Sequence, residues 1–236
     1  MKNKSGVYRG RPSHRLRNTI LAILLIGVLC FSALLALVLE GSEAGGHIGH
    51  VSAMVLLQQV LFKVGDQLPV FVAGGISTGR MVAHLLMMGA SGVQLGTRFV
   101  MTEECKAHPN FKNAFRRANA RDAVSTPQYD SALPVVAVRA LRNRGMQEFG
   151  KLQLRLLKEL EAGTIHRQQA QDEVEKYWMG ALRRAVVDGD IDYGSVMAGQ
   201  SVGMADEVIP VKALIDELVT DASLELERIK GKLSVF

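Results

Sequence analysis

Short apolar runs alternate with helix-like segments between residues 36 and 100. The runs "ALVLEG" and "LPVFVAGGI" are rich in aliphatic and aromatic residues and end at glycine, which is typical of strands buried in a parallel sheet. Each is followed by apolar positions three or four residues apart, first over 54–64 and then within "STGRMVAHLLMMG", as on one face of a helix. With the third run, "SGVQLGTRFV", the alternation predicts an α/β fold with right-handed crossovers. A (β/α) barrel is the preferred form, and an open doubly wound sheet is the alternative.

Residues 100–236 are expected to be mostly helix and connecting loop. The segments "MQEFGKLQLRLLKELEAG" and "AQDEVEKYWMGALRRAVVDG" are amphipathic, and each is closed by a glycine. "VIPVKALIDELVTDASLELERIKGKL" predicts a terminal helix whose charges form a solvated face. A glycine-rich loop, "GDIDYGSVMAGQSVG", lies between the last two helices.

The first part of the chain combines a basic head with a long apolar segment. Residues 19–39 carry no charged side chain, and a helix that spans a bilayer needs about 20 such residues. A membrane helix is therefore expected over 19–33, and residues 34–39 fit either that helix or a strand. Residues 1–35 are predicted to stand apart from a domain over 36–236, with membrane contact through 19–39 as a hypothesis.

Charge and composition argue against several classes of protein. The net charge of +5 comes from the basic head, and the rest of the chain is near neutral, so no basic face indicates nucleic acid. Cys30 and Cys105 have no metal-ligand or disulfide-framework spacing. The sequence contains no GxGxxG after a strand, no P-loop and no GxSxG elbow, which argues against a Rossmann dinucleotide site, an NTPase and a serine hydrolase.

Two glycine-containing loops follow successive predicted strands. "AGGIS" includes Gly74 and Gly75, and "QLGTR" includes Gly96 and Thr97. Glycines at strand ends let backbone N–H groups approach an anion, and the hydroxyl of Thr97 adds a donor. Together the loops suit a phosphorylated cofactor. The equally weighted alternative is that these glycines only permit tight turns.

The stretch "EGSEAGGHIGH" carries candidate acid–base chemistry. A histidine such as His47, in a flexible glycine loop at the carboxyl end of a strand, can exchange protons near neutral pH. A metal site is the rival reading, because His47 and His50 are spaced HxxH. We expect no metal, because that spacing carries little weight alone and the carboxylates of Glu40 and Glu43 are not clearly placed. For any lone histidine, a hydrogen bond to the backbone is the default.

Several of these motifs together resemble one enzyme family. "EGSEAGGHIGH", "PVFVAGGI", "GVQLGTRFV", "AHPNFK" and "GSVMAGQSVG" occur in the order found in the C-terminal half of nitronate monooxygenases, formerly called 2-nitropropane dioxygenases. That family includes the flavin-dependent enoyl-(acyl-carrier-protein) reductases. The resemblance runs from about Ala36 to about Leu226. It implies the C-terminal part of a TIM-type barrel that binds FMN, with added C-terminal helices.

The resemblance also implies roles for particular residues. Gly74 and Gly75, with the run Gln94, Leu95, Gly96 and Thr97, would hold the FMN phosphate. Glu40 would face the flavin and Gly45 would pass close to it. His47 would be the catalytic residue, abstracting the proton α to the nitro group or orienting the nitronate. "GSVMAGQSVG" would form a loop near the site.

The resemblance leaves three functions open. The first is oxidation of alkyl nitronates by O2, and the second is reduction of an enoyl thioester by NADH or NADPH through FMN. The third arises because members of the family carry well over a hundred residues before "EAGGH", whereas this sequence has a basic head and an apolar run that resemble nothing in the family. A truncated, inactive, membrane-anchored remnant with weak FMN binding is therefore also expected.

The expected partners and cellular location depend on which of these functions the protein has. A small-molecule substrate, either a nitronate or an enoyl thioester, is expected, and a homo-oligomer is left open. The family implies a cytoplasmic protein, whereas a membrane helix within 19–39 implies an anchored one.

Overall fold

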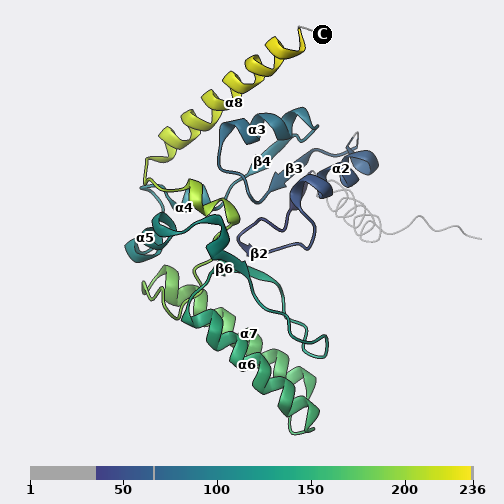
Figure 1. Ribbon diagram of the computed structural model, residues 1–236, viewed down its shortest axis with the longest axis vertical. Coiled ribbons are helices and arrows are strands. Elements are labelled where there is room, and N and C mark those ends of the chain that lie inside the picture. The colour runs from purple at the N-terminus through teal and green to yellow at the C-terminus, as the bar shows by residue number, and fades with distance from the viewer. Residues whose placement is uncertain (1–35, 66, 235–236) are drawn as a thin grey trace, which may run out of the picture. The chain divides into compact units, whose positions relative to one another are not determined.

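The computed structural model describes residues 36–65 and 67–234 (Figure 1). The chain divides into Met1–Leu37 and Val38–Phe236, and the second unit holds nearly all of the described elements. The membrane helix expected over 19–33 lies outside the described residues. Within the described ranges, no helix has both the length and the apolar character needed to cross a bilayer.

A three-stranded sheet carries the first part of the fold. Its strands are β1 (Leu37–Glu40), β3 (Val70–Ala73) and β4 (Gly92–Gln94), in the order β1-β3-β4. β3 and β4 pair in parallel, with Val72 opposite Val93. Each strand is followed by a helix before the next strand of this sheet begins, so the predicted β-loop-α alternation is confirmed.

Helices α2 (Ala53–Val64) and α3 (Gly79–Met87) connect these strands. Leu57 of α2 and Leu85 of α3 are fully buried, and both belong to the apolar cluster that contains Val72 of β3. Burial of such side chains is the main stabilising contribution to a sheet–helix layer of this kind. The helical spacing read from the sequence therefore identified the buried face correctly.

A second, antiparallel sheet was not predicted. It consists of β2 (Gly46–His47), β6 (Val138–Leu141) and β5 (Ala123–Ser125), in the order β2-β6-β5. The expectation of helix and loop after residue 100 is wrong for β5 and β6. Both strands are too short to show an alternating pattern, and all four residues of β6 are buried, including Arg139. A charged residue in a fully buried strand hides it from a hydropathy pattern.

The remaining helices follow the second half of the chain. α6 and α7 run side by side as a helical hairpin (Figure 1), here called the α6–α7 hairpin, around Phe149, Leu156 and Val174. Their predicted positions are confirmed. Two short 3-10 helices, η1 and η2, complete the fold. The bounds are α4 (Thr97–Val100), α5 (Pro109–Arg117), η1 (Ala120–Asp122), α6 (Arg144–Glu161), α7 (Arg167–Val186), η2 (Gln200–Met204) and α8 (Val211–Leu233).

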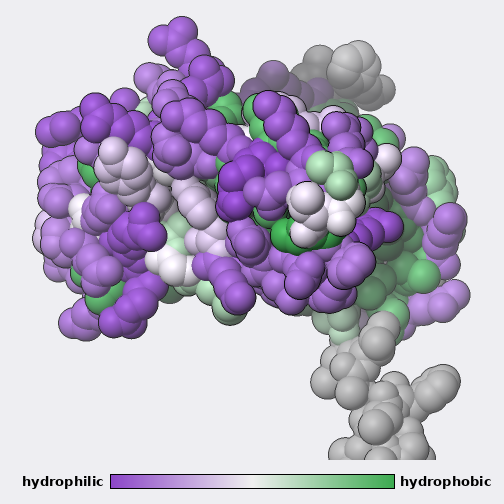
Figure 2. Space-filling model, turned by 90° about the horizontal axis from the view of Figure 1, so that it is seen from below, coloured by the Kyte–Doolittle hydropathy of each residue, from purple (hydrophilic) through white to green (hydrophobic). Residues whose placement is uncertain are grey.

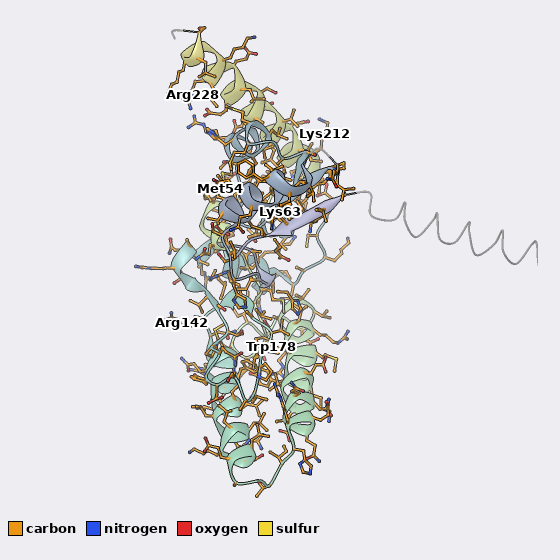
Figure 3. All side chains as sticks on the ribbon, turned by 90° about the vertical axis from the view of Figure 1, so that its right-hand side faces the viewer. Met54, Lys63, Arg142, Trp178, Lys212 and Arg228 are labelled. Atoms are coloured by element: carbon orange, nitrogen blue, oxygen red, sulfur yellow. The ribbon has the colours of Figure 1, made fainter. Side chains whose placement is uncertain are left out.

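The terminal helix α8 packs against α3. The expectation that its charges are all solvated is wrong for Glu225, which is only 3% exposed. The Glu225 carboxylate is paired with Arg228 on the same helix, and Figure 3 shows Arg228 on α8. The carboxylate also meets His84 Nε2 of α3 at 3.1 Å. A buried carboxylate needs hydrogen-bonding or charged partners. His84 can serve as one because α3 packs against α8.

The molecular surface is mostly hydrophilic on the face seen from the hairpin end, and apolar side chains gather there in limited patches (Figure 2). Several exposed apolar side chains belong to α7 or to the strand region opposite it, among them Val136, Met179 and Leu182. An exposed cluster of apolar side chains commonly marks a binding surface.

Candidate functional site

A cavity of about 230 Å³ lies at the carboxyl ends of β1, β3 and β4. We call it the glycine pocket. It is lined by residues from four separate segments of the chain, including the loop over 197–201. All eight residues predicted to contact a cofactor border it, namely Glu40, Gly45, Gly74, Gly75, Gln94, Leu95, Gly96 and Thr97.

The turn after β3 requires glycine. Gly74 has φ +96° and Gly75 has φ +71°, backbone conformations that are costly for any residue with a Cβ atom. A Cβ atom on Gly74 would also lie 2.9 Å from the Cβ atom of Ala44. These glycines were expected either to permit a tight turn or to border a cofactor. The two expectations are compatible, because the glycines form a tight turn and also border the pocket.

Two loops approach each other backbone to backbone at Gly45. A Cβ atom there would lie 2.4 Å from the amide nitrogen of Gly199, which is far inside van der Waals contact. The same amide of Gly199 donates to Thr97 Oγ1 at 3.1 Å. The Thr97 hydroxyl, expected to act as a donor to an anion, thus accepts one bond inside the protein, and its own hydrogen can still be donated.

The loop after β4 leaves room for a ligand. Gly96 borders the pocket, and no atom lies within 4 Å of the position that a Cβ atom would occupy. Among the described lining residues there is no lysine or arginine. An anion held there would depend on backbone N–H groups and on the hydroxyls of Thr97 and Ser201. This glycine-rich cradle, which has one carboxylate and no basic side chain among the described residues, suits the phosphate of a nucleotide-type cofactor only through its backbone N–H groups and hydroxyls.

The volume limits how much of a cofactor these residues enclose. Sites that bury most of a small molecule usually measure about 300–1,000 Å³, whereas the glycine pocket measures about 230 Å³. The described residues therefore enclose less volume than such sites usually have.

Glu40 lies at the end of β1 and borders the glycine pocket. Burial raises the pKa of the Glu40 carboxyl, and the charge of His47 opposes that shift. The side chains of Glu40 and His47 therefore interact electrostatically.

His47 is placed differently from the prediction. It lies on β2, where it pairs with Val138 of β6, and not at the tip of a flexible loop. Its side chain is exposed and borders a second cavity, of about 540 Å³, beside the α6–α7 hairpin. We call this the hairpin cavity. Met197 borders both cavities, and Gly46 borders the glycine pocket. His47 is thus next to the eight predicted cofactor residues without lining their pocket.

Arg139 supports the segment that carries Glu40 and His47, and sequence reasoning missed it. The residue as a whole is 9% exposed. Its Nη2 donates to the carbonyl oxygen of Ser42 at 2.8 Å, and Nη1 donates to that of Ala123 at 2.6 Å. Burial lowers the pKa of Arg139, and the carboxylate of Glu43 opposes this shift. A single arginine within the apolar run "PVVAVRAL" was the available signal.

Glu43 is a second supporting residue. Its Oε2 accepts a hydrogen bond from the amide of Ala53 at 3.0 Å, and its carbonyl oxygen accepts one from the amide of Gln200 at 2.9 Å. These bonds fasten the 41–47 loop both to the start of α2 and to the loop over 197–201. Within the described residues, no group of three His, Cys, Asp or Glu side chains is arranged to hold a metal ion.

Glycine loops at the carboxyl ends of strands in a β-loop-α arrangement, next to a histidine, are typical of α/β proteins that bind small molecules at this end of the sheet. The profile of the family described as nitronate monooxygenase matches residues 15–221. The chain belongs to the nitronate monooxygenase family, whose fold is a TIM-barrel-like α/β fold and whose members are generally flavin-dependent oxidoreductases acting on small molecules.

The match corrects one expectation. It begins at residue 15, whereas the motifs placed the start near Ala36 and indicated that the preceding apolar run resembles nothing in the family. The reason is that four of the five motifs contain glycine, and the first of them begins at Glu40. Apolar stretches upstream contain no such landmark.

Individual relatives cover most of this chain. It is 30% identical, over 81% of its length, to (3aS,4S,5R,7aS)-5-hydroxy-7a-methyl-1-oxo-octahydro-1H-indene-4-carboxyl-CoA dehydrogenase of Mycobacterium tuberculosis, and covers 60% of that protein. The structure of FabK from Thermotoga maritima is similar with a TM-score of 0.71 and 35% identity, covering 87% of this chain and 60% of FabK. Nitroalkane oxidase from Streptomyces ansochromogenes is similar with a TM-score of 0.62 and 28% identity, covering 83% of this chain and 53% of that one. The chain thus spans little more than half the length of these relatives.

Proposed function

We propose that this protein is an FMN-dependent oxidoreductase that oxidises alkyl nitronates with O2. The observation that carries the proposal is that Met197 borders both cavities, one lined by the glycine loops and the other bordered by His47. A cofactor in the first would lie across Met197 from a substrate in the second. Membership of the nitronate monooxygenase family supports the same chemistry.

The glycine pocket would hold FMN. Gly74 and Gly75, with Gln94, Leu95, Gly96 and Thr97, would surround the phosphate, while Glu40 and Gly45 flank the flavin. When bound, FMN would supply the electron transfer between the nitronate and O2. The absence of basic side chains from the described lining means that backbone N–H groups bear the phosphate charge.

His47 would remove the proton from the carbon next to the nitro group. A neutral imidazole accepts a proton readily near pH 7. The charge that forms on the ring is favoured by Glu40, whose carboxylate already interacts with His47. The overall reaction is balanced when two nitronates and one O2 give two carbonyl products and two nitrite ions, with the carbon–nitrogen bond broken and a carbon–oxygen bond formed.

The test compares His47→Gln with the unchanged protein at saturating FMN, measuring oxygen uptake. With neutral nitroethane we expect kcat/KM to fall by about 100-fold or more, the usual contribution of a general base. With preformed ethylnitronate, from which the proton is already gone, the loss should be much smaller. His50→Gln is the matched control, because His50 is exposed and lies in the same segment; it should behave like the unchanged protein. Equal losses on both substrates would show that His47 is not the base.

A second candidate is the reduction of an enoyl thioester by NADH or NADPH. The relative from M. tuberculosis is named as a dehydrogenase of a carboxyl-CoA compound, which favours a thioester substrate. Consumption of NADH or NADPH that depends on an enoyl thioester, with no nitronate-dependent oxygen uptake, would select this candidate over the first.

A further inference from the structure

Two buried side-chain polar atoms have no hydrogen-bond partner among the described residues. They are the indole Nε1 of Trp178, on α7, and the hydroxyl oxygen of Ser195, in the loop between α7 and η2. Ser195 is only 6% exposed, so bulk water does not serve its hydroxyl. Buried polar atoms in folded proteins nearly always have a partner, either in the protein or in ordered water. Both atoms therefore need a partner from outside the chain.

Trp178 and Ser195 border the same small cavity. It measures about 10 Å³ and lies between α7, the start of α6 and the loop over 193–195. We call it the indole cavity. One water molecule needs about 10–15 Å³ of space, and no organic ligand fits into so small a volume. The cavity is therefore the space in which a shared partner of the two atoms can sit.

The indole ring is held by its neighbours and cannot turn to find a partner elsewhere. Its centroid lies 4.6 Å from that of Phe149, which is fully buried, and the ring meets Tyr177 edge to face with centroids 6.0 Å apart. Close packing of this kind leaves a side chain little freedom to move. The partner of the indole N–H has to enter the cavity instead.

The groups around the cavity suit water. An indole N–H can only donate, whereas a serine hydroxyl donates one hydrogen bond and accepts others. A single molecule that both accepts and donates satisfies the two groups together, as water does. Gly145 and Gly194 also border the cavity. Their carbonyl oxygens each accept a hydrogen bond, from the Tyr177 hydroxyl and the Asn143 amide respectively, and each keeps a second lone pair.

We propose that the indole cavity holds one ordered water molecule, which accepts the hydrogen of Trp178 Nε1 and is hydrogen-bonded to the Ser195 hydroxyl. A buried water commonly makes about three hydrogen bonds, and the carbonyl oxygens at the cavity offer the third. The water joins α7 to the loop that follows it. This inference does not depend on the proposed function.

The joined loop is the one that reaches the glycine pocket. At Ser195 its amide already donates to the carbonyl oxygen of Ala181 on α7 at 2.8 Å. One residue later, the carbonyl oxygen of Val196 accepts from the amide of Leu141 on β6 at 2.9 Å. The loop then continues to Gly199, which borders the glycine pocket. The water thus helps to fix the segment that forms one wall of that pocket.

The single tryptophan of the sequence allows a direct test by NMR. The 15N-labelled full chain gives one indole N–H signal, and its cross-relaxation with water is measured in the laboratory and rotating frames. We expect a water cross-peak with the signs of a molecule held far longer than surface water. The rotating-frame sign also separates this contact from exchange of the indole hydrogen itself. A missing cross-peak, or one with the signs of surface water, would overturn the inference.

Three variants tie the signal to the indole cavity. Ser195→Val fills the cavity with methyl groups and should abolish the cross-peak. Ser195→Ala removes the hydroxyl and leaves the space open, so the cross-peak should remain and is then not due to the serine hydroxyl hydrogen. Ser77→Val is the matched control, because Ser77 is 1% exposed, its Oγ donates to the carbonyl oxygen of Ser201 at 3.4 Å and it does not border the cavity. It should keep the cross-peak.

Each result has a clear meaning. Persistence of the cross-peak in Ser195→Val, or its loss in Ser195→Ala or Ser77→Val, would contradict a water in this cavity. The amide signals of each variant report whether it is folded, and an unfolded Ser195→Val would leave the unchanged protein and Ser195→Ala to decide. A crystal structure gives an independent check, with one water oxygen expected within about 3.2 Å of both atoms. A dry cavity in the electron density would reject the inference.

Discussion

Two glycines of the glycine pocket, Gly45 and Gly96, are needed for different physical reasons. At Gly45 a side chain would collide with the backbone of Gly199, whereas at Gly96 it would enter open space. Both residues were predicted from a resemblance to line a cofactor, yet the physical demands at the two positions differ. Gly45 is required by packing between loops, and Gly96 keeps volume free for a ligand.

This difference gives a prediction at the residue scale. Gly45→Ala should destabilise the protein by about 1–3 kcal/mol, the usual cost of overpacking. Gly96→Ala should change stability by less than about 0.5 kcal/mol, because its φ of −109° suits alanine. It should nevertheless lower FMN affinity about tenfold or more by filling the cradle. Denaturant unfolding and FMN titration measure the two effects, and unchanged FMN affinity in Gly96→Ala would show that the phosphate lies elsewhere.

At the scale of elements, helix α8 is fastened to α3 by one buried acid. The hydrogen bond from Arg228 is the main cause that lowers the pKa of Glu225 to about 2, with further contributions from the charges of Arg228, His84 and Arg80 and an opposing one from burial. Because the pKa in the folded protein is below the ordinary value of 4.5, ionised Glu225 stabilises the fold at neutral pH. That contribution is fully present above about pH 4.5 and is lost as the pH falls through about 2.

The corresponding prediction concerns Glu225→Gln. At pH 7 the Tm of the variant should be about 2–4 °C below that of the unchanged protein, a shift typical of a moderate loss of unfolding free energy in a chain of this size. The difference in Tm should become smaller as the pH is lowered from 4.5 to 2, because the unchanged protein then loses the charge of Glu225. Glu227→Gln is the control, since Glu227 is exposed and meets Lys230 only at 3.7 Å. A difference in Tm that does not change with pH would show that Glu225 stabilises the fold through packing and not through its charge.

At the scale of the whole molecule, the glycine pocket is small for a site that would hold FMN. Tight small-molecule sites bury about 70–90% of the ligand surface, and a pocket of about 230 Å³ is too small for that. The described residues would therefore contact only part of a bound FMN.

We therefore expect weak FMN binding by the chain as given. Calorimetric titration of the purified full chain should give a dissociation constant in the micromolar range or above, about −8 kcal/mol or weaker. FMN should be lost during size-exclusion chromatography, while Gly45→Ala should show no measurable binding. A yellow protein that keeps one FMN per chain through chromatography would contradict this expectation.

Pattern and motif reasoning predicted some parts of the site and missed others for identifiable reasons. The loops at Gly74 and Gly96 were predicted because glycine after an apolar run is a strong local signal. The strand that carries His47 was missed because it is two residues long and exists only through pairing with β6. Arg139 was missed because its hydrogen-bond partners, Ser42 and Ala123, are distant in sequence.

The sequence by itself determined the parallel strands, the helices between them, the glycine loops at their ends and the family to which they belong. These features depend on local periodicity and on residues with special backbone freedom, and both can be read along the chain. Only the tertiary structure decided that His47 borders the hairpin cavity, that Met197 borders both cavities and that Glu225 is buried. Those facts depend on which distant segments pack together, and packing is set by the burial of many side chains at once.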